Sequence, residues 1–310
     1  MTRKLAVLDA PRHLGSRPVP GAAVDAHWLS YELRQRDLVA RLGARDAGLV
    51  EAHGCRCTEE PARPTGGPGR GDTRVGFQSF TEALARRTRE LVGAREFPVV
   101  LGGDCSILLG NMLALRRIGR YGLVFVDGRD EYSYAPGQQR HCGYFAAAGL
   151  DLALATGNGP DSLSNLNGLR PYVDERNVVL FGMVRAPGEA MLGCDPREAT
   201  PIQQFHIERI REVGARAAAG EALRYLEAQD VDGFWIHVDA DVLDRSAESD
   251  DEDEPGGLEF DELSDALRVF LSSERAVGLE MTIYDPELDP DGVHGEQLVD
   301  SVVRAFDATA

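Results

Sequence analysis

Two aspartates directly after a strongly apolar segment are the residues of this chain best placed to do chemistry. Trp235–Val238 has the pattern of a buried strand, and Asp239 and Asp241 follow it, with Asp244 close behind. Burying an unpaired carboxylate costs several kcal/mol, so these side chains need a cation, a metal ion or a proton. Because alternate residues of an extended chain point to the same side, Asp239 and Asp241 are expected to share one face. The segment therefore predicts a site for a charged partner.

Two other apolar segments also end in polar clusters. One ends in the sequence GGDCS at 102–106, where the glycines allow a tight turn and Ser106 can cap a following helix. The other ends in DGRDE at 127–131. In an open parallel sheet, ligands bind outside the carboxyl ends of the strands. We therefore expect the three clusters to converge, and together they indicate a site more strongly than any one of them alone.

The elements that must position these clusters are short apolar segments alternating with longer amphipathic ones. The predicted strands are Lys4–Leu8, Pro98–Leu101, Gly122–Val126, Asn177–Phe181, Gly233–Val238 and Ala276–Ile283. The predicted helices include Phe80–Val92, Ser106–Arg117, Ile207–Glu227, Phe260–Leu271 and Gln297–Phe306. Strands that are apolar throughout and are separated by helices indicate a parallel sheet covered on both faces. With no internal repeat and no linker-like stretch, residues 1–310 are expected to form one domain.

The order and spacing of these motifs resemble those of the ureohydrolase superfamily, which contains arginases, agmatinases and formimidoylglutamases. The resemblance is carried by GGDCS at 102–106, DGRDE at 127–131, DADVLD at 239–244, PGGLEF at 255–260 and GLEMTIYDP at 278–286. It implies an α/β fold, a three-layer α/β/α sandwich around a mainly parallel sheet of about eight strands.

The same resemblance implies a metal site, and here the chain departs from the superfamily. Typical members bind two manganese ions through bridging aspartates and two histidines. The matching positions in this chain that could still ligate a metal are Cys105, Asp127, Glu131, Asp239 and Asp241. Cys105 and Arg129 stand where the histidines are expected, and Glu131 stands where an aspartate is usual. Arginine has no acceptor and is not deprotonated in proteins, so Arg129 cannot ligate a metal.

The remaining ligands favour a reduced metal content. A thiolate with carboxylates suits zinc or iron(II) better than manganese. We therefore expect either one divalent ion (Zn, Fe or Mn) or none. In the second case the guanidinium of Arg129 would pair with the aspartates and replace the missing positive charge.

Two neighbouring residues are candidates for proton transfer. The superfamily's shuttle histidine, which precedes a glycine, falls near residues 139–143 of this chain, QRHCG. Either His141 keeps that role as a general base, or Cys142 replaces it. A thiol beside His141 could also be activated as a nucleophile.

The late strand bears on the substrate. Superfamily members that cleave guanidines hold the substrate cation with an acidic residue, and the matching position here is Ile283. An isoleucine cannot pair with a cation, so arginine and agmatine are not expected as substrates. Glu280 and Tyr284 are the nearby candidates for substrate binding. His237, further back along its strand, is interpreted as a core histidine rather than a ligand.

The sequence is compatible with four functions. The first is a divergent hydrolase that acts on a C–N bond of a small metabolite, with a metal-activated water as the attacking group. The second is a non-catalytic protein in which Arg129 has replaced the metal. The third is a metal-free enzyme that uses the acidic cluster, Arg129 and the pair His141 and Cys142. A haloacid-dehalogenase-type phosphatase is the weakest, because it leaves GGDCS and DGRDE unexplained.

Composition limits the partners. The formal net charge of −18 disfavours nucleic acids and anionic membranes, and fits a protein that binds a small-molecule substrate. No apolar run approaches the roughly 20 residues that a membrane helix needs. Five cysteines without framework spacing indicate free thiols, so a cytoplasmic location is expected. The superfamily resemblance also implies a homo-oligomer, a trimer or a hexamer.

Overall fold

Eight strands form a single sheet in the computed structural model, which describes residues 3–11, 28–51, 73–128, 149–184, 200–243, 256–284 and 286–307. The strands are β1 (Leu5–Ala10), β2 (Arg45–Leu49), β3 (Phe97–Gly102), β4 (Tyr121–Val126), β5 (Val178–Phe181), β6 (Gln203–Phe205), β7 (Gly233–Asp239) and β8 (Ala276–Thr282). Their order across the sheet is β2-β1-β3-β8-β7-β4-β5-β6, and all of these neighbours pair in parallel. The predicted parallel sheet of about eight strands is confirmed.

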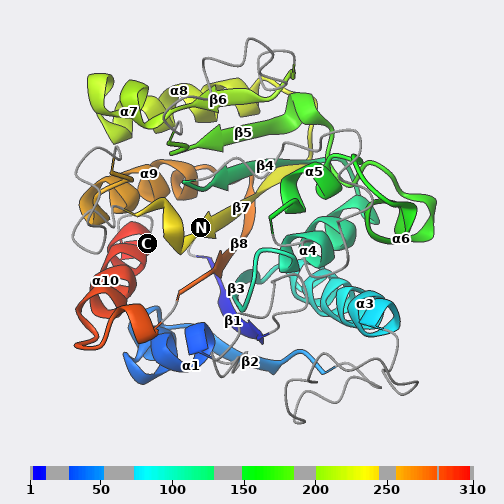
Figure 1. Cartoon of the computed structure of the whole chain (residues 1–310), viewed down its shortest axis with the longest axis horizontal. Coiled ribbons are helices and arrows are strands. Elements are labelled where there is room, and N and C mark those ends of the chain that lie inside the picture. Colours follow the sequence, from blue (N-terminus) through cyan, green and yellow to red (C-terminus); the bar gives the residue numbers. More distant parts are fainter. Residues whose placement is uncertain are drawn as a thin grey trace, which may run out of the picture.

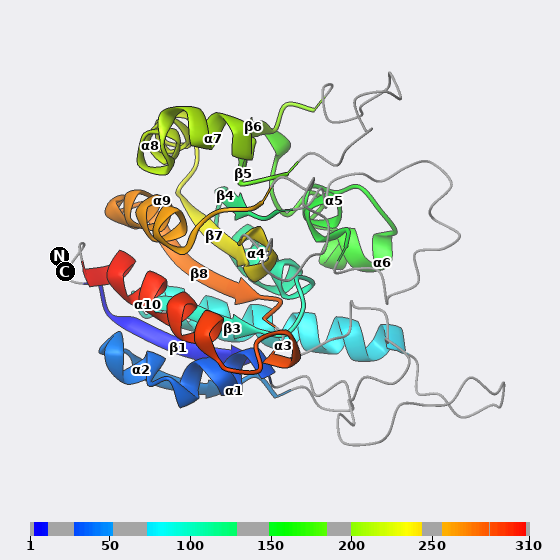
Figure 2. The same cartoon turned by 60° about the vertical axis from the view of Figure 1, so that its left-hand side comes forward.

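Helices cover both faces of this sheet (Figures 1 and 2). On one face lie α1 (Trp28–Gln35), α2 (Leu38–Arg41), α7 (Ile207–Val213), α8 (Ala215–Glu227), α9 (Phe260–Ser272) and α10 (Val293–Asp307). On the other lie α3 (Thr73–Gly93), α4 (Ile107–Arg116), α5 (Asp151–Ala155) and α6 (Asp161–Ser164). The predicted three-layer sandwich is therefore confirmed. No helix in the described ranges is long and apolar enough to cross a membrane.

The side chains of the strands alternate between two hydrophobic cores, one on each face. In β7, Phe234, Ile236 and Val238 pack in the core with α8, α9 and α10, whereas Trp235 packs in the core with α3 and α4. Every residue of β7 is buried. The alternation places His237 and Asp239 on the same face as Trp235, the one that α3 and α4 cover. The side chains of His237 and Asp239 can therefore meet residues from the α3 and α4 side of the sheet at the end of β7.

Two edge strands, the short helices α1, α2, α5 and α6, and several helix boundaries differ from the sequence prediction. The edge strands β2 and β6 were not predicted, because their sequences RDAGL and QQF lack an apolar run. Four of the five residues of β2 are exposed, as an edge position allows. The predicted helix Ile207–Glu227 is broken at Gly214, whose φ of 87° separates α7 from α8. A positive φ favours glycine, which has no Cβ to clash.

A buried carboxylate, Asp289, ties the end of β8 to the start of α10. It accepts hydrogen bonds from the Tyr284 hydroxyl (2.6 Å) and from the backbone amides of His294 (3.1 Å) and Gly295 (2.8 Å). Burial alone would raise the pKa of this carboxyl, but these hydrogen bonds outweigh it and hold the pKa below its ordinary value. The charged form of Asp289 therefore stabilises the folded state.

Asp289→Asn is expected to lower the free energy of unfolding by about 1–3 kcal/mol at pH 7, because it weakens bonds to a charged acceptor. The pKa of Asp289 is lower in the folded state than in the unfolded state. The contribution of Asp289 to the free energy of unfolding is therefore complete above the ordinary aspartate pKa of about 3.9, and it is lost as the pH falls through the pKa of the folded state. Urea unfolding of both proteins between pH 3 and pH 7 measures this. The exposed Asp291→Asn is the matched control, and an equal loss in both variants would contradict the prediction.

Candidate functional site

The three predicted clusters meet at one edge of the sheet because their strands are near neighbours. β3, β8, β7 and β4 are consecutive in the sheet, and parallel pairing brings all of their carboxyl ends to the same edge. Val126 pairs with Val238, so Asp127 and Asp239 leave β4 and β7 side by side. Asp239 in turn pairs with Thr282 of β8. The loop after β3 supplies Cys105 from the other side of β8.

Three carboxylates form the first group of potential metal ligands. Asp127, Asp239 and Asp241 offer oxygens that all lie within 4.8 Å of one another. Asp127 and Asp239 are buried. Contrary to the sequence prediction, the chain is not extended as far as Asp241, because residues Ala240–Val242 form a 3-10 turn. In this turn the Asp241 amide donates to Asp239 Oδ1 at 2.9 Å. The turn, rather than an extended strand, therefore brings the two side chains together.

Gly128 allows this close approach of two backbone segments. A Cβ at this position would lie 2.7 Å from the carbonyl oxygen of Asp241. Such a distance is a clash with the backbone, which cannot move aside as a flexible side chain could. The glycine in the DGRDE motif therefore has a structural reason: it lets the end of β4 pack directly on the turn after β7.

Cys105 lies in the turn that leads into α4, and it is buried against the end of β7. Its Sγ is 2.7 Å from Asp239 Oδ2 and 3.4 Å from Thr282 Oγ1. The thiol thus donates to a carboxylate that the sequence already assigned to the site. Ser106 does not cap α4 with its side chain as predicted; instead its amide donates to Asp104 Oδ1 at 3.0 Å.

His237 is a packed core histidine, as predicted, but it also belongs to the site. Its ring stacks on Phe125 with centroids 4.5 Å apart and an interplanar angle of 10°. Its Nδ1 lies 2.8 Å from Glu280 Oε1. One ring nitrogen of His237 also joins Cys105 and Asp239 in a second group of potential ligand atoms within 4.8 Å of one another. Alternation along β7 placed His237 on the face of Asp239, and this was the signal that could have identified it.

The two residues predicted to bind substrate make internal contacts in this structure. Glu280 is fully buried, and its carboxylate accepts from Asn111 and contacts His237. Tyr284 is half-buried and donates its hydroxyl to Asp289; burial and this bond both raise the pKa of Tyr284. Ile283 has φ of 57°, which is a strained conformation for a β-branched residue. Its amide donates to the carbonyl of Gly103 at 3.1 Å, which holds β8 against the GGDCS turn.

The other predicted site residues lie outside the described residues. These are Arg129, Glu131, His141 and Cys142. Their predicted roles stay predictions.

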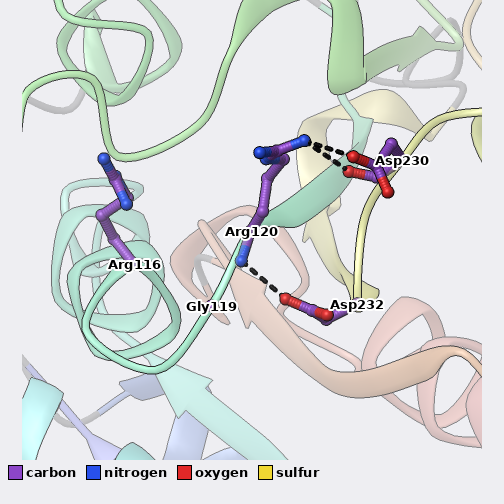
Figure 3. Close-up of a pocket in the computed structure, with 5 residues that line it drawn as sticks. All are labelled: Arg116, Gly119, Arg120, Asp230 and Asp232. Carbon is purple, nitrogen blue, oxygen red and sulfur yellow. Dashed lines mark hydrogen bonds and ion pairs between the residues drawn. The ribbon is translucent and has the colours of Figure 1, made fainter.

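A polar hollow of about 400 Å³ lies at the opposite edge of the sheet (Figure 3). It is lined by Arg116, Gly119, Arg120, Asp230 and Asp232. Arg120 pairs with Asp230 at 2.6 Å, and its amide donates to Asp232. Arg120 immediately precedes β4, whereas Asp127 immediately follows it, so the hollow is separated from the carboxylates by the length of the strand. It makes no contribution to the candidate site.

The two groups of ligand atoms suit different ions. Asp127, Asp239 and Asp241 offer oxygen only, which suits manganese or magnesium. Cys105, His237 and Asp239 offer sulfur, nitrogen and oxygen, which suits zinc. Asp239 belongs to both groups. The described residues therefore fit a divalent ion at this edge of the sheet, with Asp239 as the ligand common to either position.

Comparison with known proteins agrees with the resemblance of the sequence motifs to the ureohydrolase superfamily. A sequence model of the arginase family matches residues 9–306. The chain is 26% identical over 235 residues to an arginase of Staphylococcus aureus (strain MRSA252), covering 74% of each chain. It is 26% identical over 226 residues to an arginase of Bacillus subtilis (strain 168), covering 71% of this chain and 72% of the relative.

Solved structures share the fold over nearly the whole chain. The arginase of Bacillus caldovelox superimposes with a TM-score of 0.76 at 21% identity, covering 99% of this chain and 98% of the other. A formimidoylglutamase of Bacillus subtilis has a TM-score of 0.70 at 18% identity, with coverage of 99% and 88%. A proclavaminate amidino hydrolase of Streptomyces clavuligerus has a TM-score of 0.65 at 16% identity, with coverage of 98% and 93%.

Proposed function

The chain belongs to the arginase family, and from that premise we propose that it is a hydrolase that cleaves a C–N bond of a small metabolite other than arginine or agmatine. The observation that carries the proposal is the convergence of Asp127, Asp239 and Asp241 within 4.8 Å at the carboxyl edge of the sheet. Three carboxylates so close together repel one another, and a divalent cation bound between them would relieve this repulsion.

In the proposed mechanism, a bound divalent ion would supply Lewis acidity, activating water and polarising the group that is attacked. Asp239, the ligand common to both groups, would hold it, with either Cys105 and His237 or Asp127 and Asp241 completing the set of protein ligands. Thr282, which contacts the Cys105 sulfur, would fix the orientation of that side chain. His141 would move the proton from the attacking water to the leaving nitrogen, as the sequence resemblance implies. Arg129 would balance the negative charge of the carboxylates that the ion does not reach.

Substrate choice is proposed to follow from Ile283. Relatives of this fold include a formimidoylglutamase and a proclavaminate amidino hydrolase, so formimidoyl and amidino compounds are the classes to test. We expect no urea from arginine or agmatine, because Ile283 offers no charge to hold the guanidinium, and an unpaired buried cation is costly. A colorimetric urea assay, with ammonia release as the readout for other substrates, measures this. Turnover of arginine at a rate of about 1 per second or faster, within the usual range for enzymes, would contradict the assignment.

The decisive first experiment is metal analysis of the purified protein, followed by the same substrate panel. One equivalent of zinc, iron or manganese supports the proposal, whereas two tightly bound manganese ions would overturn a reduced site. A protein that binds no metal and turns over no substrate would favour the non-catalytic alternative, in which Arg129 replaces the ion. Restoring both histidines, in the double variant Arg129→His and Cys105→His, should strengthen manganese binding if the residue matching is correct.

A further inference from the structure

A chain of buried hydrogen bonds crosses the core from α3 to β7 and ends at His237. The Thr88 hydroxyl donates to Asn111 Oδ1 at 2.6 Å, and the Asn111 amide donates to Glu280. Glu280 Oε1 lies 2.8 Å from His237 Nδ1. All four side chains are 0% exposed, so water does not compete with these bonds. Such a continuous polar chain in a core is costly unless every member is satisfied.

The direction of these bonds fixes the tautomer of His237. Since Asn111 accepts from a hydroxyl through its oxygen, its amide nitrogen must be the atom that donates to Glu280. The Glu280 carboxylate is an acceptor, so His237 Nδ1 carries the hydrogen that fills the 2.8 Å contact. The Nε2 atom is then left with its lone pair. A carboxylate that holds Nδ1 in this way is the usual companion of a histidine that binds a metal through Nε2.

The Nε2 atom itself is buried and has no hydrogen-bond partner among the described residues. A buried nitrogen left in this state costs free energy, and native structures rarely leave one without a reason. A ring nitrogen of His237 lies within 4.8 Å of ligand atoms of Cys105 and Asp239. The Cys105 thiol already contacts Asp239 at 2.7 Å, so a cation would take the place of the proton between these two atoms.

We propose that His237, Cys105 and Asp239 bind one zinc ion, with Glu280 orienting His237 from behind. Thiolate sulfur, imidazole nitrogen and carboxylate oxygen are together a zinc-type ligand set, and three protein ligands leave the fourth position open for water or substrate. His237 thereby supplies the imidazole that is missing at position 105. Its place two residues before Asp239 moves the ion toward the core, away from Asp127. Among the described residues, Cys105 shares no such group with Asp127.

This inference extends the proposed function by naming the ion and its ligands, but the zinc site can exist in a protein that hydrolyses nothing. The test therefore reads binding directly. The full chain is stripped with a chelator, titrated with zinc and analysed for stoichiometry. Zinc-edge X-ray absorption should then show one sulfur at about 2.3 Å and one imidazole in the shell. A shell of oxygen alone, or no binding at all, would overturn the proposal.

Four variants distinguish an ion bound by the group that contains Cys105 and His237 from one bound by the group that contains Asp127 and Asp241. His237→Gln and Cys105→Ser should weaken zinc binding at least 100-fold, and Glu280→Gln about 10–100-fold, because Glu280 acts on the ion only through His237. Asp127→Asn, which alters only the carboxylate group, should weaken zinc binding far less than His237→Gln does, and Asp265→Asn on the surface of α9 is the matched control that should keep affinity and stoichiometry. Retention of zinc in His237→Gln together with its loss in Asp127→Asn would place the ion at the carboxylate group and reject the inference.

These experiments distinguish a failure of the hydrolase assignment from a failure of the zinc site. Zinc bound through sulfur and imidazole in a protein that cleaves none of the tested substrates would reject only the hydrolase assignment. Hydrolysis supported by an ion without sulfur in its shell would reject only the zinc site. If circular dichroism shows that His237→Gln does not fold, the zinc-edge X-ray absorption spectrum of the unaltered protein still shows whether sulfur and imidazole bind the ion.

Discussion

Asp239→Asn is expected to remove the bound ion and to lower kcat for the cleaved metabolite about 1000-fold. Asp239 is the one residue that belongs to both groups of ligand atoms, so its loss weakens an ion in either position. Asparagine keeps the volume and the oxygen that accepts from the Asp241 amide, so the fold should persist. A factor of 1000 corresponds to about 4 kcal/mol of transition-state stabilisation, which is within what a catalytic ion supplies.

Metal analysis and turnover of the same preparation check this result. Asp265→Asn is the matched control, because Asp265 is a half-exposed aspartate of α9 that pairs with Arg216 at 2.6 Å, away from both groups of ligand atoms. It should leave metal content and kcat unchanged. An Asp239→Asn protein with full metal content and full activity would show that the carboxylate edge of the sheet is not the reaction centre.

Gly278→Ala is expected to lower the free energy of unfolding by about 3 kcal/mol. Gly278 of β8 pairs with Trp235 of β7, and a Cβ at position 278 would lie only 2.0 Å from Cζ3 of the indole. Trp235 is fully buried and cannot swing aside without displacing the core that it shares with α3 and α4. Inserting a methyl group into such a closely packed contact costs roughly 1–3 kcal/mol and sometimes more.

Equilibrium unfolding in urea measures this loss, and Gly220→Ala gives a control of the opposite sign. Gly220 lies within α8, where the nearest atom to a new Cβ is the far end of Arg224 at 3.5 Å. Alanine is favoured over glycine in a helix interior by about 1 kcal/mol, so this variant should gain stability. The double variant Trp235→Phe with Gly278→Ala should lose less than the sum of its two single changes. Strict additivity would contradict the proposed clash.

The central strands could be predicted from the sequence because burial on both faces leaves a continuous apolar run. Gly233–Val238 and Gly122–Val126 were located to within a residue for this reason. The edge strands could not be, because β2 has the sequence RDAGL and is stabilised by its backbone pairing with β1 rather than by its own side chains. The break at Gly214 was equally hidden, since one glycine within a helical pattern is compatible with a continuous helix.

For the site, the sequence identified residues at strand ends but not their partners across the sheet. Asp127 and Asp239 could be assigned because each follows an apolar strand, whereas Cys105 was assigned only because its motif resembles that of the superfamily. The contact of His237 with Glu280 depends on the register between β7 and β8, in which these two residues are paired. Register is a property of two strands distant in the chain, so the periodicity of either strand alone does not contain it.

The position of β8 has a consequence for how the protein is made. β8 is the last of the described strands in the chain, yet it lies between β3 and β7 in the middle of the sheet. A chain emerging from the ribosome can first form two separate half-sheets, β2-β1-β3 and β7-β4-β5-β6, with Cys105 in one and Asp239 in the other. Only when β8 inserts do these residues meet. The group formed by Cys105, His237 and Asp239 is therefore assembled only after β8 has been made, whereas Asp127, Asp239 and Asp241 already lie together in one half-sheet.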